Sequence, residues 1–243
     1  MIIDVRLDAG IDKLGNVQGG MFRIKIPFAN WVEIEANAVS DHWHITEDMR
    51  TRYGITSTQN IRFDGDLNFK TKIRILTENK NRPALAFQAT AKTAAGDFMS
   101  AHRYTDSAGY EFSVLASKDL FNSDENLVRK VRILSEIAFV AWDTQQSQQN
   151  DSYKVSAGVQ IDGSKFNMKV SFLGFYGWQN PDYDFVSTLQ LEASKNFKNN
   201  FQLYGQANIG LSKAATPLLV GGGIRYFMNA PKRKRKSIPY VQP

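Results

Sequence analysis

Charged residues at every second position of two segments are the clearest candidates for chemistry in this chain. Lys70, Lys72 and Arg74 alternate with apolar residues in one segment, and Glu33 and Glu35 do so in an earlier one. Alternate residues of a β-strand point to the same face, so each set forms a ladder on one side of a sheet. Opposite charges on paired strands lie within about 4.5–5.5 Å of each other. Such a face predicts either a charged constriction that selects solutes by sign and size or interior ion pairs that hold the fold rigid.

The three histidines are the other candidates. His42 and His44 flank a tryptophan, and an H-x-H pair on a strand places both imidazoles on one face, as in some zinc sites. No third ligand can be named, so we predict no metal site and interpret the pair as solvated loop residues. Neither His44 nor His102 has a serine two positions later, and the chain has no Gly-x-Ser-x-Gly elbow. We therefore predict no catalytic residues and no cofactor.

The charged residues belong to segments in which apolar and polar residues alternate. Between 61 and 76, Ile61, Phe63 and Ile73 share one parity, whereas the charged residues take the other. A helix would scatter these charges around its circumference, but a strand separates them onto one face. The pattern recurs along the chain and is least clean in 127–142. The strands predicted in this way span residues 3–7, 21–28, 32–37, 61–76, 85–92, 110–117, 127–142, 153–161, 166–172, 185–193, 201–209 and 218–228.

Composition indicates which fold these strands build. Hydrophobic residues make up 42% of the 243 residues, the mean hydropathy is -0.36, and there is no cysteine. No apolar run reaches the roughly 18 residues of a membrane helix. In a membrane barrel only every second residue faces lipid, so low mean hydropathy is expected. We predict an all-β fold, an antiparallel up-and-down transmembrane β-barrel of about twelve strands, with a lumen that is polar throughout. A soluble ligand-binding barrel, with its apolar face inward, is the alternative fold.

Connections and aromatic residues orient the predicted barrel. Bacterial barrels alternate short periplasmic turns with longer external loops. The short turns are predicted at 29–30, 79–82, 162–165 and 196–200, and the longer loops at 40–59, 95–108 and 143–151, with 118–126 long for a turn. Aromatic girdles are expected at both interfaces, with Phe28, Phe166 and Phe201 at the turn end and Tyr110, Tyr153, Tyr176 and Phe185 at the other. An even strand number places both chain ends on the periplasmic side.

The barrel is predicted to cover residues 1–228 and to be followed by a basic, proline-flanked tail, 229–243. Residues 232–236 read KRKRK and contribute five of the formal net charge of +6, so the body is nearly neutral. A nucleic-acid partner is therefore not expected. We expect a solvated tail that contacts anionic head groups or another anionic periplasmic component. The start, MIIDVRLDAG, lacks the pattern of a secretory signal, so we expect the sequence to be that of a mature chain.

Three short motifs carry a family resemblance. They are RYGIT at 52–56, GDL at 65–67 and the K-x-R-x-L pattern of 72–76. Together they resemble the outer-membrane barrels grouped with phenol-degradation pathway proteins, in which an RYGLT-like turn precedes a strand and GDL begins the next. The resemblance covers a small part of the chain and concerns turns more than a binding site. It implies the barrel architecture and a role in transport.

These observations predict a bacterial outer-membrane channel for passive passage of small solutes, with outer-membrane lipid and the solutes as its partners. One alternative is a non-conducting structural or adhesion barrel whose loops 40–59 and 95–108 bind partners. Another is a barrel-embedded lipid-modifying enzyme that depends on His44 or His102. The residues predicted to line the lumen and set its selectivity are Glu33, Glu35, Lys70, Lys72, Arg74, Lys92 and Glu136.

Overall fold

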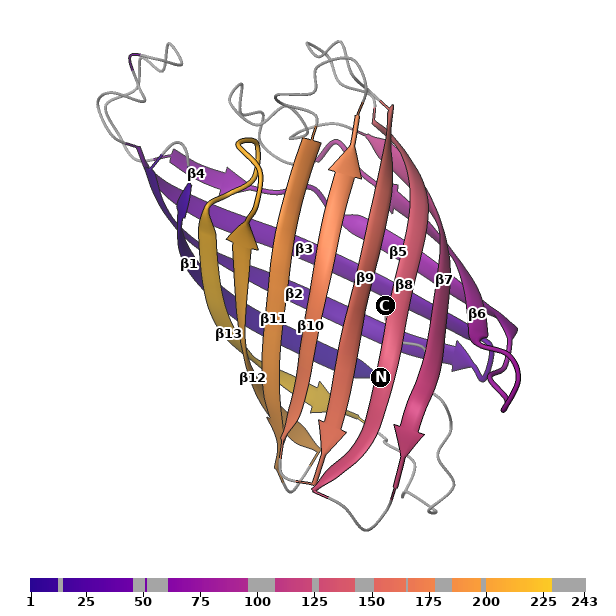
Figure 1. The fold of residues 1–243 in the computed structure, drawn as a ribbon. Coiled ribbons are helices and arrows are strands. Elements are labelled where there is room, and N and C mark those ends of the chain that lie inside the picture. Colours follow the sequence, from indigo (N-terminus) through magenta and orange to yellow (C-terminus); the bar gives the residue numbers. More distant parts are fainter. Residues whose placement is uncertain are drawn as a thin grey trace.

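Antiparallel strands form a single sheet that closes on itself (Figure 1). The computed structural model describes residues 1–12, 15–45, 51, 61–95, 108–123, 127–142, 151–164, 166–177, 185–197 and 200–228. Strand β1 (Ile2–Asp12) pairs with β2 (Gly15–Ala29) on one side and with the last strand, β13 (Leu218–Phe227), on the other, which closes the barrel. The remaining strands are β3 (Val32–Ile45), β4 (Ile61–Asp64), β5 (Asn68–Leu76), β6 (Ala84–Lys92), β7 (Gly109–Asn122), β8 (Val128–Trp142), β9 (Asp151–Gly163), β10 (Asn167–Tyr176), β11 (Phe185–Asn196) and β12 (Phe201–Gly210).

Strands β4 and β5 share one position in the barrel, because both pair with β3. The fold is therefore the twelve-strand barrel that the sequence predicts, but the single strand expected at 61–76 is interrupted. Residues 65–67 stand opposite residues 38–39 of β3, one residue too many for regular pairing. Asp66 is buried at this point, where its carboxylate accepts the Ala95 N–H at 3.0 Å and pairs with Lys92. These contacts hold the irregular segment against the inner wall.

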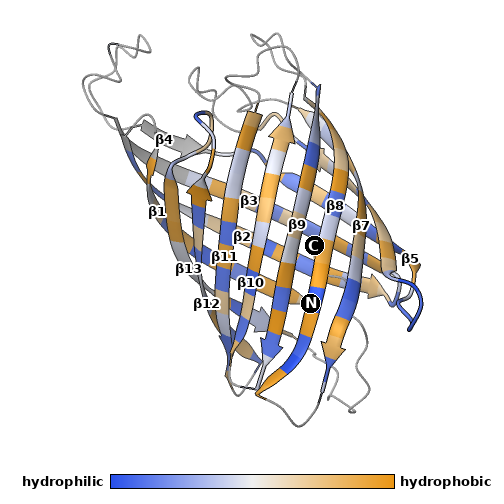
Figure 2. Ribbon diagram, in the orientation of Figure 1, coloured by the Kyte–Doolittle hydropathy of each residue, from blue (hydrophilic) through white to orange (hydrophobic). Residues whose placement is uncertain are grey.

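The two faces of the barrel differ in polarity. Large apolar side chains on the outer face are open to the surroundings, with Leu7 71%, Phe28 76% and Ile137 66% exposed. Figure 2 shows hydrophobic and hydrophilic residues alternating along the strands. An apolar outer face is the arrangement of a transmembrane barrel, and it is the reverse of a soluble barrel that holds an apolar ligand.

The inner face is polar over most of its circumference, but on β6, β7 and β8 it also carries buried apolar side chains among polar ones such as Ser113, Arg132 and Glu136. Leu134 and Val140 of β8 point inward and are buried, and Ala84, Ala86 and Leu115 form a buried apolar cluster beside them. The prediction of a lumen that is polar throughout is therefore wrong for this wall. Side chains fill the interior of narrow barrels, so an apolar wall can be covered from inside. The uneven alternation of 127–142 has the same cause.

Strand ends differ from the expected connections in two places. Strand β3 continues to Ile45, paired with both β2 and β4, so residues 40–45 are strand and not loop. Strand β7 continues to Asn122, which shortens the connection expected at 118–126. The Met1 amino group donates to the Met228 carbonyl at 3.1 Å, so the ends of the barrel sequence meet at one rim, as predicted.

Aromatic rings pair near both ends of the strands. Tyr176 and Phe185 lie with their ring centroids 5.6 Å apart, and Phe201 and Tyr226 lie 4.7 Å apart at the opposite ends of neighbouring strands. Rings at these levels fit the two water interfaces of a membrane. The tail 229–243 lies outside the described residues, so its separation from the barrel stays a prediction.

In the part of the chain that the structure describes, no helix has the length and apolar character needed to cross a membrane.

Two of three consecutive glycines in β13, Gly221 and Gly223, have no room for a side chain, because an added Cβ would meet atoms of β1. Gly223 faces inward beneath the ring of Tyr204, so a Cβ there would stand 2.6 Å from the Tyr204 hydroxyl and would also meet the Val5 carbonyl oxygen. Gly222 faces outward, and a Cβ there would have its nearest neighbour, the Tyr204 carbonyl oxygen, 3.5 Å away. Close packing thus requires a glycine at Gly223 and not at Gly222.

Replacing Gly223 by alanine is expected to lower the free energy of unfolding by about 1–3 kcal/mol, the cost of overpacking a well-filled interior. Urea unfolding of the barrel in liposomes, followed by tryptophan fluorescence, measures this change. Gly222→Ala is the matched control and should stay within about 0.5 kcal/mol of the wild type. Equal losses in the two variants would show that close approach at Gly223 is not the reason for its glycine.

Candidate functional site in the barrel lumen

Two charged ladders face each other on the inner surface of β3 and β5. The strand register pairs Glu33 with Lys72 and Glu35 with Lys70. The ammonium nitrogens lie 3.0 Å and 3.4 Å from the carboxylates of Glu33 and Glu35, respectively. The predicted pairing of these two strands is confirmed, and four of the seven predicted residues form one cluster.

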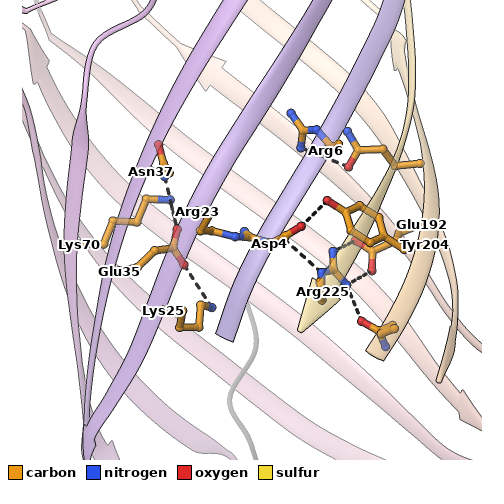
Figure 3. Close-up of polar contacts among 12 residues, drawn as sticks. Asp4, Arg6, Arg23, Lys25, Glu35, Asn37, Lys70, Glu192, Tyr204 and Arg225 are labelled. Carbon is orange, nitrogen blue, oxygen red and sulfur yellow. Dashed lines mark hydrogen bonds and ion pairs between the residues drawn. The ribbon is translucent and has the colours of Figure 1, made fainter. Parts of the chain in front are cut away.

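Lys25 of β2 completes this cluster, which we call the β3 ladder. Its ammonium group lies 3.3 Å from Glu33 and 3.2 Å from Glu35. Figure 3 shows Lys25 and Lys70 on either side of Glu35. The hairpin between β2 and β3 places Lys25 opposite Glu35, so the sequence contained the signal, although Lys25 was not among the predicted residues. Three cations share two carboxylates here, which leaves one surplus positive charge.

The other predicted residues lie apart from the β3 ladder. Arg74 lies near the turn end of β5, and among the described residues no ion pair is found for its side chain. Lys92 pairs with Asp66 at the opposite end of the barrel. Glu136 of β8 lies 2.8 Å from Lys154, which also pairs with Glu111 at 2.7 Å. The seven residues therefore do not form a single constriction.

A second cluster, which could not be found from the sequence, joins the first and last strands. We call it the seam cluster, and it centres on Asp4 of β1, whose side chain is fully buried. The Tyr204 hydroxyl donates to the Asp4 carboxylate at 2.6 Å, Arg225 lies 3.2 Å from it, and Arg23 also pairs with it (Figure 3). A single carboxylate thus connects β1 with β2, β12 and β13.

Arg225 extends the seam cluster to β11. Its two terminal nitrogens donate to both carboxylate oxygens of Glu192, at 2.7 Å and 2.8 Å. The guanidinium also lies over the ring of Tyr204, 3.8 Å from the ring centroid, which is favourable for a cation and an aromatic face. Bidentate geometry fixes the plane of the guanidinium, so the seam cluster is held rigidly against the wall.

Water reaches the charged part of the inner wall. The side chains of Lys70, Arg23 and Glu192 are 32%, 27% and 27% exposed, although all three take part in ion pairs. In contrast, Leu115 and Val140 on the apolar wall are almost fully covered. The lumen therefore has a wet side with exposed charged groups and a covered side, on which apolar side chains lie beside buried polar and charged ones such as Ser113 and Glu136. Such a surface can hold or pass small polar solutes, because its charges and amides replace hydration.

The structure describes little of the histidines. The backbone of β3 places His42 opposite Gln18 and His44 opposite Asn16, so the predicted loop position of this pair is wrong. The side chains of His42 and His44, and all of His102, lie outside the description. Within the described residues, no group of three histidine, aspartate or glutamate side chains is placed to hold a metal ion.

Comparison with known proteins identifies the fold. No protein-family model and no curated protein sequence matches the chain. Among solved structures, the NanC porin superposes with a TM-score of 0.63 at 9% identity, covering 93% of this chain and 100% of that one. An outer membrane channel from Pseudomonas putida F1 gives 0.62 at 11% identity, covering 93% and 94%. The KdgM porin gives 0.60 at 9% identity, covering 94% and 99%.

At these identities the similarity shows the fold and not the solute. The chain has the architecture of bacterial outer-membrane porins, with a closed antiparallel barrel whose apolar face is outside. The narrower resemblance to phenol-degradation barrels stays a prediction. Its motif at 52–56 lies outside the described residues, and its motif at 65–67 is the irregular segment between β4 and β5.

Proposed function

We propose that this protein is an outer-membrane channel through which small polar solutes pass passively. The observation that carries the proposal is the water-accessible arc of charged side chains inside a closed barrel whose outer face is apolar. The shared fold with the NanC porin, the KdgM porin and the Pseudomonas putida channel supports it.

In the proposed channel, ion pairs keep the charged side chains at the wall. Each lysine or arginine that is held by a neighbouring carboxylate lies along the wall instead of extending across the lumen. The seam cluster balances Arg23 and Arg225 against Asp4 and Glu192, whereas the β3 ladder has one cation in excess. Within a screening length of about 8 Å, that excess favours anions over cations.

Neutralising Lys70, Lys72 and Arg74 together, each as methionine, is expected to turn this preference toward cations. Glu33 and Glu35 then keep Lys25 as their cation in the β3 ladder, so the local charge becomes negative. We expect the chloride-to-potassium permeability ratio to fall about twofold or more in 0.1 M salt, where screening is weak. The reversal potential across a planar bilayer under a potassium chloride gradient measures the ratio.

Lys195→Met is the control, because Lys195 is exposed on the outward parity of β11 and its loss removes charge outside the lumen. Its permeability ratio should equal that of the wild type. An unchanged ratio in the triple variant would count against a conducting lumen that contains the β3 ladder.

One observation favours a second candidate, a non-conducting structural barrel. Side chains on the inner face of β6 to β8 are covered, with Leu115 and Val140 1% and 0% exposed, which favours an interior that is filled on this side. A barrel plugged in this way would leave liposomes unswollen by urea or glycerol. A channel would let both solutes enter and would exclude larger sugars.

A further inference from the structure

A small cavity lies on the inner wall where β10, β11 and β12 face the start of β1. Its volume is about 160 Å³, and its lining includes Arg6, Lys169, Ser171, Gln190, Glu192 and Gln206. An engineered cavity of about 150 Å³ holds one benzene molecule, so this space suits one small organic molecule. It lies beside the seam cluster and on the wet side of the lumen, since Arg6 is partly exposed.

The charge on this lining is positive. Arg6 and Lys169 contribute two cations and Glu192 contributes one anion. Both oxygens of Glu192 already accept hydrogen bonds from Arg225, at 2.7 Å and 2.8 Å. Asp8, the carboxylate beside Arg6, accepts from Arg6 Nε at 2.6 Å. The acidic oxygens near the cavity are thus engaged by cations. Of the five N–H donors of the Arg6 guanidinium, one contacts Asp8 and one contacts the Gln206 side-chain oxygen at 3.3 Å, so three remain beyond these two contacts.

Neutral polar groups complete the lining. The amides of Gln190 and Gln206 can each donate and accept hydrogen bonds. The Ser171 hydroxyl lies 3.4 Å from the Gln190 side-chain oxygen, a long contact that either group can exchange for a ligand hydroxyl. These groups can form hydrogen bonds with the hydroxyl groups of a ligand, whereas an aromatic or aliphatic ligand surface would leave them without partners.

We infer that this cavity is a binding subsite for a small carboxylate that also carries hydroxyl groups. The carboxylate is held on the side of Arg6 and Lys169, and the hydroxyls bind Ser171, Gln190 and Gln206. Charged hydrogen bonds are the strong ones, so the anionic group determines affinity and the amides determine which anions fit. The inference rests on the proposed function, because a solute reaches this wall through the lumen, and it specifies the class of solute.

Equilibrium binding of D-glycerate to the folded barrel in detergent tests the subsite, with glycerol as the neutral analogue. Calorimetry or saturation-transfer NMR should show glycerate binding at least about tenfold more tightly than glycerol, as expected for one charged hydrogen bond. Lys169→Met keeps the aliphatic stem and removes the charge, and it should raise the glycerate Kd about tenfold. Lys169→Arg, which keeps the charge, should restore most of the affinity.

Lys130→Met is the matched control, because Lys130 lies on the inward parity of β8, pairs with Asp119 and does not line the cavity. Its glycerate Kd should change by less than about twofold, since Lys130 offers no hydrogen bond to a molecule in the cavity. Heat-modifiable migration on gels establishes that each variant is folded. Equal weakening by Lys169→Met and Lys130→Met would overturn the subsite in favour of a general lumen field, and so would the absence of glycerate binding.

These outcomes are independent of whether the barrel conducts, because binding is measured without a membrane potential. A barrel that conducts ions but does not bind glycerate overturns the subsite alone. A barrel that binds glycerate but passes no current overturns the channel alone.

Discussion

Replacing Asp4 by asparagine is expected to lower the free energy of unfolding of the barrel by about 3 kcal/mol. This value is at the lower end of the cost of breaking a buried ion pair, because the two arginines that pair with Asp4 are partly exposed. The substitution keeps the shape of the side chain but removes the charge that Arg23 and Arg225 share. It also weakens the acceptor of the 2.6 Å hydrogen bond from Tyr204. Urea unfolding in liposomes and the temperature at which the folded gel band is lost both measure the effect.

Asp8→Asn is the matched control for this prediction. Asp8 lies on the same face of β1 and is also largely buried, but among the described residues only Arg6 forms an ion pair with it, so a loss of about 1 kcal/mol is expected. Tyr204→Phe should cost a similar amount, because it removes one hydrogen bond. If Asp4→Asn is no more harmful than Asp8→Asn, the seam cluster does not hold the first strand to the last.

Replacing both Glu33 and Glu35 by glutamine is expected to make the channel strongly selective for anions. Lys25, Lys70 and Lys72 then lose the carboxylates that neutralise them, and three positive charges remain on neighbouring strands. We expect the chloride-to-potassium permeability ratio to rise about fivefold in 0.1 M salt, where the screening length is about 10 Å. The reversal potential in a planar bilayer measures this change, which is opposite in sign to that of the lysine and arginine variant.

Salt provides an internal control for the glutamate variant. At 1 M salt the screening length falls to about 3 Å, so the difference from the wild type should shrink. A difference that is the same at both salt concentrations would indicate a change of shape and not of charge. No change in selectivity at 0.1 M salt would exclude the β3 ladder from the conducting path.

The sequence was sufficient to predict the face on which most side chains lie and one of the two clusters. Alternation with period two is a local property, so it assigns Glu33, Glu35, Lys70 and Lys72 to one face without knowledge of distant partners. The two segments follow each other directly in the predicted order of strands, so the pairing of these two strands could also be predicted. The β3 ladder could therefore be predicted, apart from Lys25.

The seam cluster could not be predicted in the same way. Asp4 and Arg225 are 221 positions apart, and their contact depends on which strands close the barrel and in which register. A local pattern places each on the inner face but names no partner. The bulge at 65–67 could not be predicted for a related reason. Phe63, Leu67 and Phe69 all stand at odd-numbered positions, so the alternation of apolar and polar residues continues across the bulge without a break. On β8, Leu134 and Val140 appeared as an irregular pattern, since only the packed interior explains apolar residues there.

The most direct test of the central claim is the current through the purified, folded wild-type protein in a planar bilayer. A conducting lumen with one surplus cation in the β3 ladder should give discrete current steps in 0.1 M potassium chloride, with a reversal potential that indicates a modest preference for chloride. Absence of current from protein that inserts into the bilayer and shows the heat-modifiable band of a folded barrel would contradict this claim.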